Sequence, residues 1–243
     1  MTKRDAIFPA GRHDLYRKHG YSAAIRSGDL LFVSGQVGSL IDGSAEPDFE
    51  RQVTLAFENL KNTLAAAGIE RAFPIQAMTL PLALEGRDLI GQAKTGTGKT
   101  LGFGIPLLQR VERDDTPGAA PQALVVVPTR ELCVQVAENL RQYAAFAGLH
   151  VCTAFGGVDM SIQESAFKRG VDVIVGCPGR LLDHFQYNYA KLEGLEVLVL
   201  DEADRMLDMG FLPDIKRILA HLPRRPRHTL FFSATIPPEI ARL

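Results

Sequence analysis

The 243-residue sequence has little cysteine and almost no net charge, and each shortage excludes a class of protein. It holds three cysteines, Cys133, Cys152 and Cys177, and their spacing fits neither a disulfide framework nor a metal site. We therefore expect reduced thiols and a cytoplasmic location. The formal net charge is −1, so any contact with nucleic acid has to come from a local patch rather than from an overall basic field.

Long apolar runs are missing as well, and none approaches the roughly 20 residues that cross a bilayer. Charged residues occur throughout the first twenty residues, which leaves no apolar centre for a signal peptide. The hydrophobic fraction of 46% and the charged fraction of 23% are typical of a globular protein. We expect no membrane partner.

The first part of the chain predicts a hairpin followed by a helix. In Tyr21–Val37, two short strand-like runs flank the turn signal Ser27, Gly28 and Asp29. Residues Asp48–Ala67 then have helical periodicity, and Gly68 is a plausible stop. The apolar side chains that this periodicity places on one face are Phe49, Val53, Ala56 or Phe57, Leu60 and Leu64.

After Gly68 the pattern alternates between short apolar runs and helical stretches. The runs that predict strands are Asp88–Gln92, Ala123–Val127, Val151–Phe155, Val171–Val175, Val197–Leu200 and Thr229–Phe232. The stretches that predict helices are Lys99–Arg110, Arg130–Ala145, Ser161–Arg169, Gly179–Phe185 and Pro213–His221. Continuous apolar strands favour a parallel sheet covered on both faces. The predicted fold class is therefore α/β, a doubly wound and mostly parallel sheet preceded by a β-hairpin and a helix, with its site at the carboxyl ends of the strands.

A glycine-rich loop, AKTGTGKT, occupies Ala93–Thr100 and leads into a helix at Lys99. Backbone N–H groups and the helix dipole favour phosphate at such a position. Lys99 would reach the β- and γ-phosphates, and the Thr100 hydroxyl would bind magnesium. The expected nucleotide-binding residues of the loop are Ala93, Lys94, Thr95, Gly96, Thr97, Gly98, Lys99 and Thr100. The alternative is a helix start that merely uses glycines.

An apolar run delivers acids to a strand end in Val197–Asp204, which reads VLVLDEAD. Asp201 is placed to hold magnesium, and Glu202 to orient and deprotonate an attacking water. We expect Asp204 to hydrogen-bond a neighbouring loop. The alternative is a helix N-terminus whose acids favour its dipole. Together with the phosphate loop, the acids predict a nucleotide triphosphatase site in which Glu202 and Lys99 are catalytic.

Seven short motifs occur in a fixed order after residue 68. They are FPIQ at Phe73–Gln76, AKTGTGKT at Ala93–Thr100, PTREL at Pro128–Leu132, GG at Gly156–Gly157, PGR at Pro178–Arg180, DEAD at Asp201–Asp204 and SAT at Ser233–Thr235. With these motifs, residues 68–243 resemble the first RecA-like P-loop NTPase domain of a DEAD-box RNA helicase. The resemblance implies ATP or ADP and Mg²⁺ as cofactors, with Gln76 reading the adenine edge.

The resemblance also implies contacts with an RNA backbone, single-stranded or duplex. The residues that would make them are Thr129, Arg130, Gly157 and Arg180. The residues that would couple RNA to the ATP site are Asp204, Ser233 and Thr235. Both arginines open a helix just after a strand, where phosphate can bind, although a surface ion pair is the alternative for each. The basic loop at Arg224, Arg225 and Arg227 is interpreted as a solvated turn.

The sequence stops soon after SAT, so we expect the family's second RecA-like domain, with its arginines, to be missing. An arginine finger typically contributes a factor of ~10³–10⁵ in rate. We therefore expect weak RNA binding, little ATP hydrolysis and no unwinding. The oligomeric state stays open.

Residues Tyr21–Gly68 resemble something unrelated, the first half of a Rid (YjgF-type) enamine/imine deaminase, on IRSGDLLFVSGQVG and DFERQVTLAFENLKNTLAAAG. The expected division is a Rid-like fragment at 1–68 and a RecA-like domain at 69–243. We suspect an engineered chimera. Its inherited nucleotide site could be idle, which is the alternative to ATP binding. A Rid-type deaminase with an appended domain is a further alternative.

Overall fold

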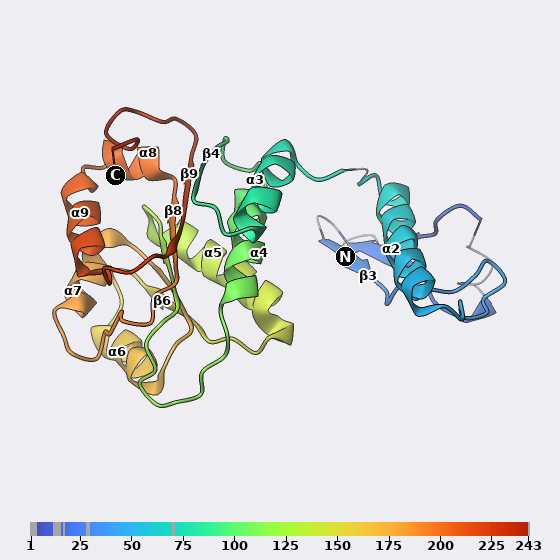
Figure 1. Ribbon diagram of the computed structural model, residues 1–243, viewed down its shortest axis with the longest axis horizontal. Helices are drawn as coiled ribbons and strands as arrows, with labels where there is room; N and C mark the ends of the chain where they lie inside the picture. The colour runs from blue at the N-terminus through green and yellow to red at the C-terminus, as the bar shows by residue number, and fades with distance from the viewer. Residues whose placement is uncertain (1–3, 12–15, 17, 28–29, 70, 243) are drawn as a thin grey trace. The chain divides into compact units, whose positions relative to one another are not determined.

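The computed structural model describes residues 4–11, 16, 18–27, 30–69 and 71–242. The chain divides into two compact units, 1–72 and 73–243 (Figure 1). Among the described residues, no helix combines the length and the apolar character that crossing a membrane requires.

The first unit holds a small antiparallel sheet and one helix. Its strands are β1 (Arg4–Ile7), β2 (Ala24–Ser27) and β3 (Leu30–Val33), in the order β1-β2-β3, and its helix is α2 (Phe49–Ala66). Strands β2 and β3 form the predicted hairpin, with Ser27 opposite Leu30. Gly28 and Asp29 of the predicted turn lie outside the described residues. Strand β1 was not predicted, because its sequence RDAI has no alternating or continuous apolar pattern.

Helix α2 begins where the sequence indicates, since the Asp48 side chain accepts a hydrogen bond from the Arg51 N–H at 2.9 Å. Its packing differs from the usual amphipathic arrangement. Phe49 is 76% exposed, Phe57 68% and Val53 40%, whereas Ala56, Leu60 and Leu64 are half-buried. The face marked by the apolar periodicity is therefore only partly covered.

The buried residues of α2 are polar instead. The Asn59 Nδ2 donates to the Val37 carbonyl at 2.7 Å, and the Thr63 Oγ1 donates to the Gln36 Oε1 at 3.3 Å. These bonds satisfy the irregular segment that follows β3, and they are the physical reason why the polar side of the helix turns inward.

The second unit contains a six-stranded sheet in which every pairing is parallel. Its strands are β4 (Leu89–Gln92), β5 (Ala123–Val126), β6 (Val151–Ala154), β7 (Val173–Gly176), β8 (Val197–Asp201) and β9 (His228–Ser233). Their spatial order is β4-β9-β8-β5-β7-β6. The predicted α/β class with a parallel, doubly wound sheet is confirmed.

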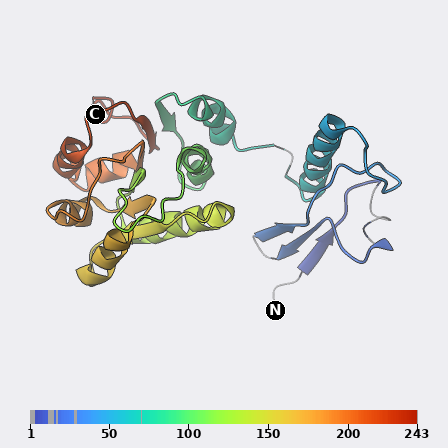
Figure 2. The ribbon, with the colours of Figure 1, turned by 60° about the horizontal axis from the view of Figure 1, so that its bottom comes forward.

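Helices cover both faces of this sheet (Figures 1 and 2). They are α3 (Pro74–Leu84), α4 (Lys99–Arg110), α5 (Arg130–Tyr143), the 3₁₀ turn η1 (Ala144–Phe146), α6 (Met160–Arg169), α7 (Pro178–Phe185), α8 (Ala203–Asp208) and α9 (Leu212–His221). Helices α3 and α8 were not predicted. Proline at the first and eighth positions of α3 obscures its pattern, and α8 has only six residues.

Successive strand residues enter opposite cores. In β5, Ala123 and Val125 pack with α4 and α5, whereas Leu124 and Val126 pack with residues of α6 to α9. This is why the strands read as continuous apolar runs. All six strands run the same way, so the loops after their carboxyl ends gather at one edge of the sheet.

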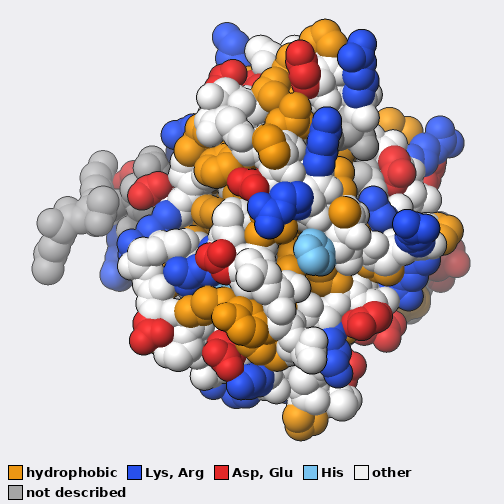
Figure 3. Space-filling view, turned by 90° about the vertical axis from the view of Figure 1, so that its left-hand side faces the viewer, with side chains coloured by type: hydrophobic (Ala, Val, Ile, Leu, Met, Phe, Trp, Pro, Cys, Tyr) orange, Lys and Arg blue, Asp and Glu red, His pale blue; other side chains and the backbone are white. Residues whose placement is uncertain are grey.

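Charge on the surface is mixed. On the face drawn in Figure 3, Lys and Arg side chains alternate with Asp and Glu, without a continuous field of one sign. This agrees with the formal net charge of −1.

Candidate functional site

The phosphate loop connects β4 to α4 at the carboxyl edge of the sheet. Gly96 and Gly98 adopt left-handed backbone angles, with φ of +81° and +82°. A side chain at Gly98 would overlap the Gln76 amide, whose Nε2 donates to the Gly98 carbonyl at 3.1 Å. The loop therefore needs glycine at this position for conformation and for space. Its start is attached to the sheet, because the Ala93 N–H donates to the Ser233 carbonyl at 2.8 Å.

Gln76 lies against this loop. Its Oε1 accepts from the Phe73 N–H at 3.2 Å, and its Nε2 contacts Gly98. The side chain thus links the start of α3 to the phosphate loop. Its predicted role in reading adenine stays a prediction.

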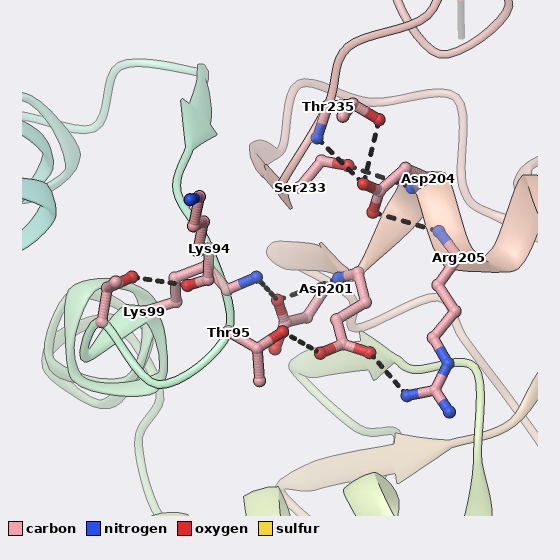
Figure 4. Close-up of polar contacts among 10 residues, drawn as sticks. Lys94, Thr95, Lys99, Asp201, Asp204, Arg205, Ser233 and Thr235 are labelled. Atoms are coloured by element: carbon pink, nitrogen blue, oxygen red, sulfur yellow. Dashed lines mark hydrogen bonds and ion pairs between the residues drawn. The ribbon is translucent and has the colours of Figure 1, made fainter.

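Lys99 is the first residue of α4, and its side chain is 5% exposed. Its Nζ lies 3.6 Å from Asp201 Oδ1, too long for a hydrogen bond, and has no hydrogen-bond partner among the described residues (Figure 4). A buried ammonium in this position costs free energy unless anionic oxygens surround it. The geometry fits a phosphate group above the loop.

Asp201 ends β8 and is 2% exposed. Burial raises the pKa of Asp201 to about 6, against the opposing effect of the Lys99 ammonium and of the Glu202 N–H that donates to it at 2.9 Å. Thr100 follows Lys99 and is half-buried. One carboxylate and one hydroxyl, completed by phosphate oxygens and water, suit Mg²⁺, which rarely uses an all-protein cage. Among the described residues, no group of three or more His, Cys, Asp and Glu could hold a metal by itself.

Glu202 is held in a strained conformation. Its φ is +52°, and no other non-glycine residue in the described part of the chain has a positive φ. Its Oε1 accepts from the Thr95 hydroxyl at 2.9 Å, and its Oε2 pairs with Arg205 Nη1 at 3.1 Å (Figure 4). The acid is therefore aimed at the phosphate loop. Arg205 was not predicted as a site residue, although its spacing of three from Glu202 on a helix was the available signal.

Asp204 joins β8 to the segment after β9. Its Oδ2 accepts from both the backbone N–H and the hydroxyl of Thr235, at 2.9 and 3.0 Å, and its own N–H donates to the Ser233 hydroxyl at 3.0 Å (Figure 4). Burial acts to raise the pKa of Asp204, but these hydrogen bonds outweigh it and hold the value below the ordinary one. The prediction that Asp204 bonds a neighbouring loop is confirmed. Its coupling role stays a prediction.

The residues predicted for RNA surround the loop after β6. The Arg130 guanidinium lies 5.0 Å from the centre of the Phe155 ring, and Gly157 adjoins it. Arg180 donates through both terminal nitrogens to the Val158 carbonyl, each at 3.2 Å, and its side chain is 13% exposed. Arg180 therefore supports the loop structurally, whatever else it contacts.

Thr129 is the N-cap of α5, where its hydroxyl accepts from the Leu132 N–H at 3.3 Å. Thr129, Arg130, Gly157 and Arg180 all follow the carboxyl ends of β5, β6 or β7. The structure brings these four residues to the same edge of the sheet as the phosphate loop. Binding of RNA by them stays a prediction.

A parallel doubly wound sheet with a phosphate loop after its edge strand, and acids after a central one, is the architecture of a RecA-like domain. Comparison with known structures agrees. A hypothetical ATP-dependent RNA helicase from Sulfolobus tokodaii superposes with a TM-score of 0.63 at 38% identity, over 74% of this chain and 51% of that one. A DEAD box protein from Methanococcus jannaschii gives 0.66 at 36% identity, over 74% and 48%.

Sequence comparison defines the family. The model for the DEAD/DEAH box helicases matches residues 73–243, so the chain belongs to the DEAD/DEAH box helicase family. The DEAD-box ATP-dependent RNA helicase CshA of Geobacillus kaustophilus is 47% identical over 186 residues, which are 76% of this chain and 39% of that protein. CshA of Streptococcus pneumoniae is 49% identical over 177 residues, 73% of this chain and 33% of that protein. The chain thus spans 33–39% of the length of these two relatives.

A second family model, described as Endoribonuclease L-PSP, matches residues 11–76. It corresponds to the Rid resemblance of the first unit. The two matches share only residues 73–76.

Proposed function

We propose that residues 73–243 bind ATP or ADP together with Mg²⁺ at the phosphate loop. The observation that carries this proposal is the Lys99 ammonium, buried at 5% exposure with no hydrogen-bond partner among the described residues. A β- or γ-phosphate would supply the missing acceptors, and backbone N–H groups at the start of α4 would add to the attraction. Gln76 would select adenine.

The residues divide the chemistry among them. Thr100 and Asp201 would hold the magnesium ion, which when bound neutralises phosphate charge and polarises the phosphoryl group. Lys99 would stabilise the charge that develops on the transferred phosphoryl. Glu202 would orient a water molecule and accept its proton at a carboxylate oxygen.

We also propose that these 243 residues by themselves hydrolyse ATP slowly, bind an RNA backbone weakly through Thr129, Arg130, Gly157 and Arg180, and unwind nothing. Arg205 is already paired with Glu202, so it does not offer a free guanidinium to the phosphate. The family resemblance implies that a second RecA-like domain contributes arginines, and an arginine finger is worth ~10³–10⁵ in rate. Three free thiols support a reducing, cytoplasmic environment.

Replacement of Lys99 tests the nucleotide site. We expect Lys99→Ala to weaken ADP–Mg²⁺ binding by at least about tenfold, since a charge-assisted contact to phosphate contributes about 1.5–3 kcal/mol. Lys94→Ala is the matched control, because Lys94 lies in the same loop but is exposed and points away from Asp201 (Figure 4). Isothermal titration calorimetry on the full chain measures both.

Equal loss in the two variants, or no saturable heat with the unmodified chain, would contradict the proposal. The second outcome would favour the alternative, a chimera that joins fragments of two families and keeps an idle nucleotide site. The observation behind this alternative is that two unrelated family models adjoin within residues 73–76.

A further inference from the structure

A pocket lies at the amino edge of the sheet, at the opposite edge from the phosphate loop. Its volume is about 360 Å³. It is formed where β8 and β9 begin and where α4 ends, and its principal lining residues are Gly86, Arg110, Glu196, Arg225, Arg227 and His228. Three of them carry guanidinium groups and one carries a carboxylate. The predicted solvated turn at Arg224–Arg227 therefore contributes two of its arginines to a concave surface.

Contacts with the backbone hold two of the three arginines in place. The Arg110 guanidinium lies over Gly86, where any side chain would overlap it. Arg225 Nη2 donates to the Leu195 carbonyl at 3.3 Å, which leaves its other nitrogens available. Asp88, a further acid that acts on His228, accepts a hydrogen bond from the Thr229 N–H at 2.7 Å through its Oδ1. With three guanidinium groups and one carboxylate in its lining, the pocket has an excess of positive charge.

His228 supplies an unpartnered polar group in the wall of this pocket. The residue is 3% exposed, and its Nε2 bonds to the Arg87 carbonyl at 2.8 Å. A carbonyl only accepts, so Nε2 carries the proton and Nδ1 is the free nitrogen. Nδ1 has no partner among the described residues, and the same is true of the buried Nε of Arg227. Such groups are costly unless a ligand or water satisfies them.

We propose that this pocket binds a phosphate group. Arginine forks match the oxygens of phosphate bidentately, and the excess of guanidinium over carboxylate selects a dianion over a neutral ligand. Arg110, Arg225 and Arg227 would hold the oxygens. A bound dianion would also favour the protonated form of His228, in which Nδ1 becomes a donor. The volume leaves room for the remainder of a phosphate ester. The site does not involve Lys99, so it does not depend on nucleotide binding at the phosphate loop.

The pKa of His228 depends on the charges around it, so a change in this pKa can report the binding of an anion. Burial lowers the pKa of His228 and Arg110 lowers it further, while the Arg87 carbonyl and Asp88 act in the opposite direction. Arg225, Arg227 and Glu196 line the same pocket. A bound dianion opposes the effect of Arg110, so phosphate should raise this pKa.

The test uses the full chain with Lys99→Ala, which should weaken phosphate binding at the phosphate loop. Inorganic phosphate is titrated while the amide signals of Arg225, Arg227 and His228 and the His228 ring signals are followed by NMR. We expect saturable shifts at these residues and a rise in the pKa of His228. Arg225→Ala should weaken the affinity by about tenfold or more, and Arg224→Ala, its exposed neighbour outside the pocket, by less than about twofold.

Two further arms identify the source of the phosphate. ADP and a short single-stranded oligonucleotide are titrated separately, with the same signals as readout. Saturation by ADP would identify the ligand as the phosphates of a free nucleotide. Saturation by the oligonucleotide would identify it as the phosphates of a nucleic-acid backbone. Equal responses of Arg224→Ala and Arg225→Ala, or shifts that never saturate with inorganic phosphate, would overturn the proposal. Both arginines are exposed, so neither variant should impair folding.

Discussion

Gly96 and Gly98 have nearly the same left-handed backbone, but their surroundings differ. A side chain at Gly96 would meet open space, whereas one at Gly98 would overlap the Gln76 amide. The sequence motif contains both glycines and does not distinguish these two reasons for them. Only the position of α3 against the loop shows that Gly98 is also needed for space.

Alanine at each glycine separates conformation from space. We expect Gly96→Ala to lower the free energy of unfolding by about 1–2 kcal/mol, the cost of a left-handed Cβ. Gly98→Ala should cost at least about 1 kcal/mol more, because Gln76 has to move and loses its bond to the loop. Urea unfolding of the two variants measures the difference. Equal costs would show that Gln76 does not press on Gly98.

Most residues that the structure gathers around the phosphate loop were predicted from the sequence alone, because loop and acid motifs are contiguous. Both motifs follow carboxyl ends of strands in one sheet, but β9 lies between β4 and β8, so the 3.6 Å approach of Lys99 to Asp201 is seen only in the tertiary structure. The contact of Glu202 with Thr95 could not be predicted, since it joins segments 107 positions apart and depends on the strained φ of Glu202.

At the scale of elements, α7 is held to α6 by a buried polar chain. His184 is fully buried, with its Nε2 3.0 Å from Gln163 Oε1 and its Nδ1 3.0 Å from the Tyr189 hydroxyl. Gln163 Nε2 donates to the Phe155 carbonyl at 3.0 Å, so Gln163 Oε1 accepts from His184. The histidine is thereby fixed as the neutral Nε2–H tautomer, one turn after Arg180.

This arrangement predicts a loss of stability in mild acid. Burial, aided by Arg180, lowers the pKa of His184 to about 4 from an ordinary 6.5. As pH falls below 6.5 the unfolded chain takes up the proton first, so the contribution is complete above pH 6.5 and is lost towards pH 4. Since a pKa difference of one corresponds to about 1.4 kcal/mol, the loss is at most about 3.5 kcal/mol.

Urea unfolding at a series of pH values measures the slope of the free energy of unfolding against pH. In His184→Gln the slope between pH 6.5 and 4 should be shallower, although the variant is less stable at neutral pH. Replacement of the exposed His221 serves as the control and should leave the slope in place. An unchanged slope in His184→Gln would show that other groups cause the acid sensitivity.

At the scale of the whole molecule, the two units differ in how much core they have. Among the described residues up to position 72, the buried apolar side chains are Tyr16, Ala23, Ala24 and Ala67. The second unit has two extensive cores, one on each face of its sheet. Hydrophobic burial is roughly proportional to apolar area, so the second unit should account for nearly all of the stability.

Separation of the units tests the proposed division of the chain. We predict that residues 73–243 alone unfold cooperatively and bind ADP–Mg²⁺ within about twofold of the full chain, as expected for a domain with its own core. Residues 1–72 alone should show no cooperative transition, because three antiparallel strands and one helix bury too little. Calorimetric unfolding and titration measure both. Loss of binding in 73–243 would mean that the first unit contributes to the site.

The sequence by itself determined the α/β class and indicated all six strands and five of the seven α-helices of the second unit, and it predicted the residues of the phosphate loop. It could do so because buried parallel strands are contiguous apolar runs and because phosphate chemistry needs adjacent residues. The tertiary structure alone decided the strand order β4-β9-β8-β5-β7-β6, which places Thr235 on Asp204 across 31 positions of sequence. It also decided which face of α2 is buried, and it brought Arg110, Arg225 and His228 into one pocket. Those outcomes depend on hydrogen bonds and packing between distant segments, which local periodicity does not encode.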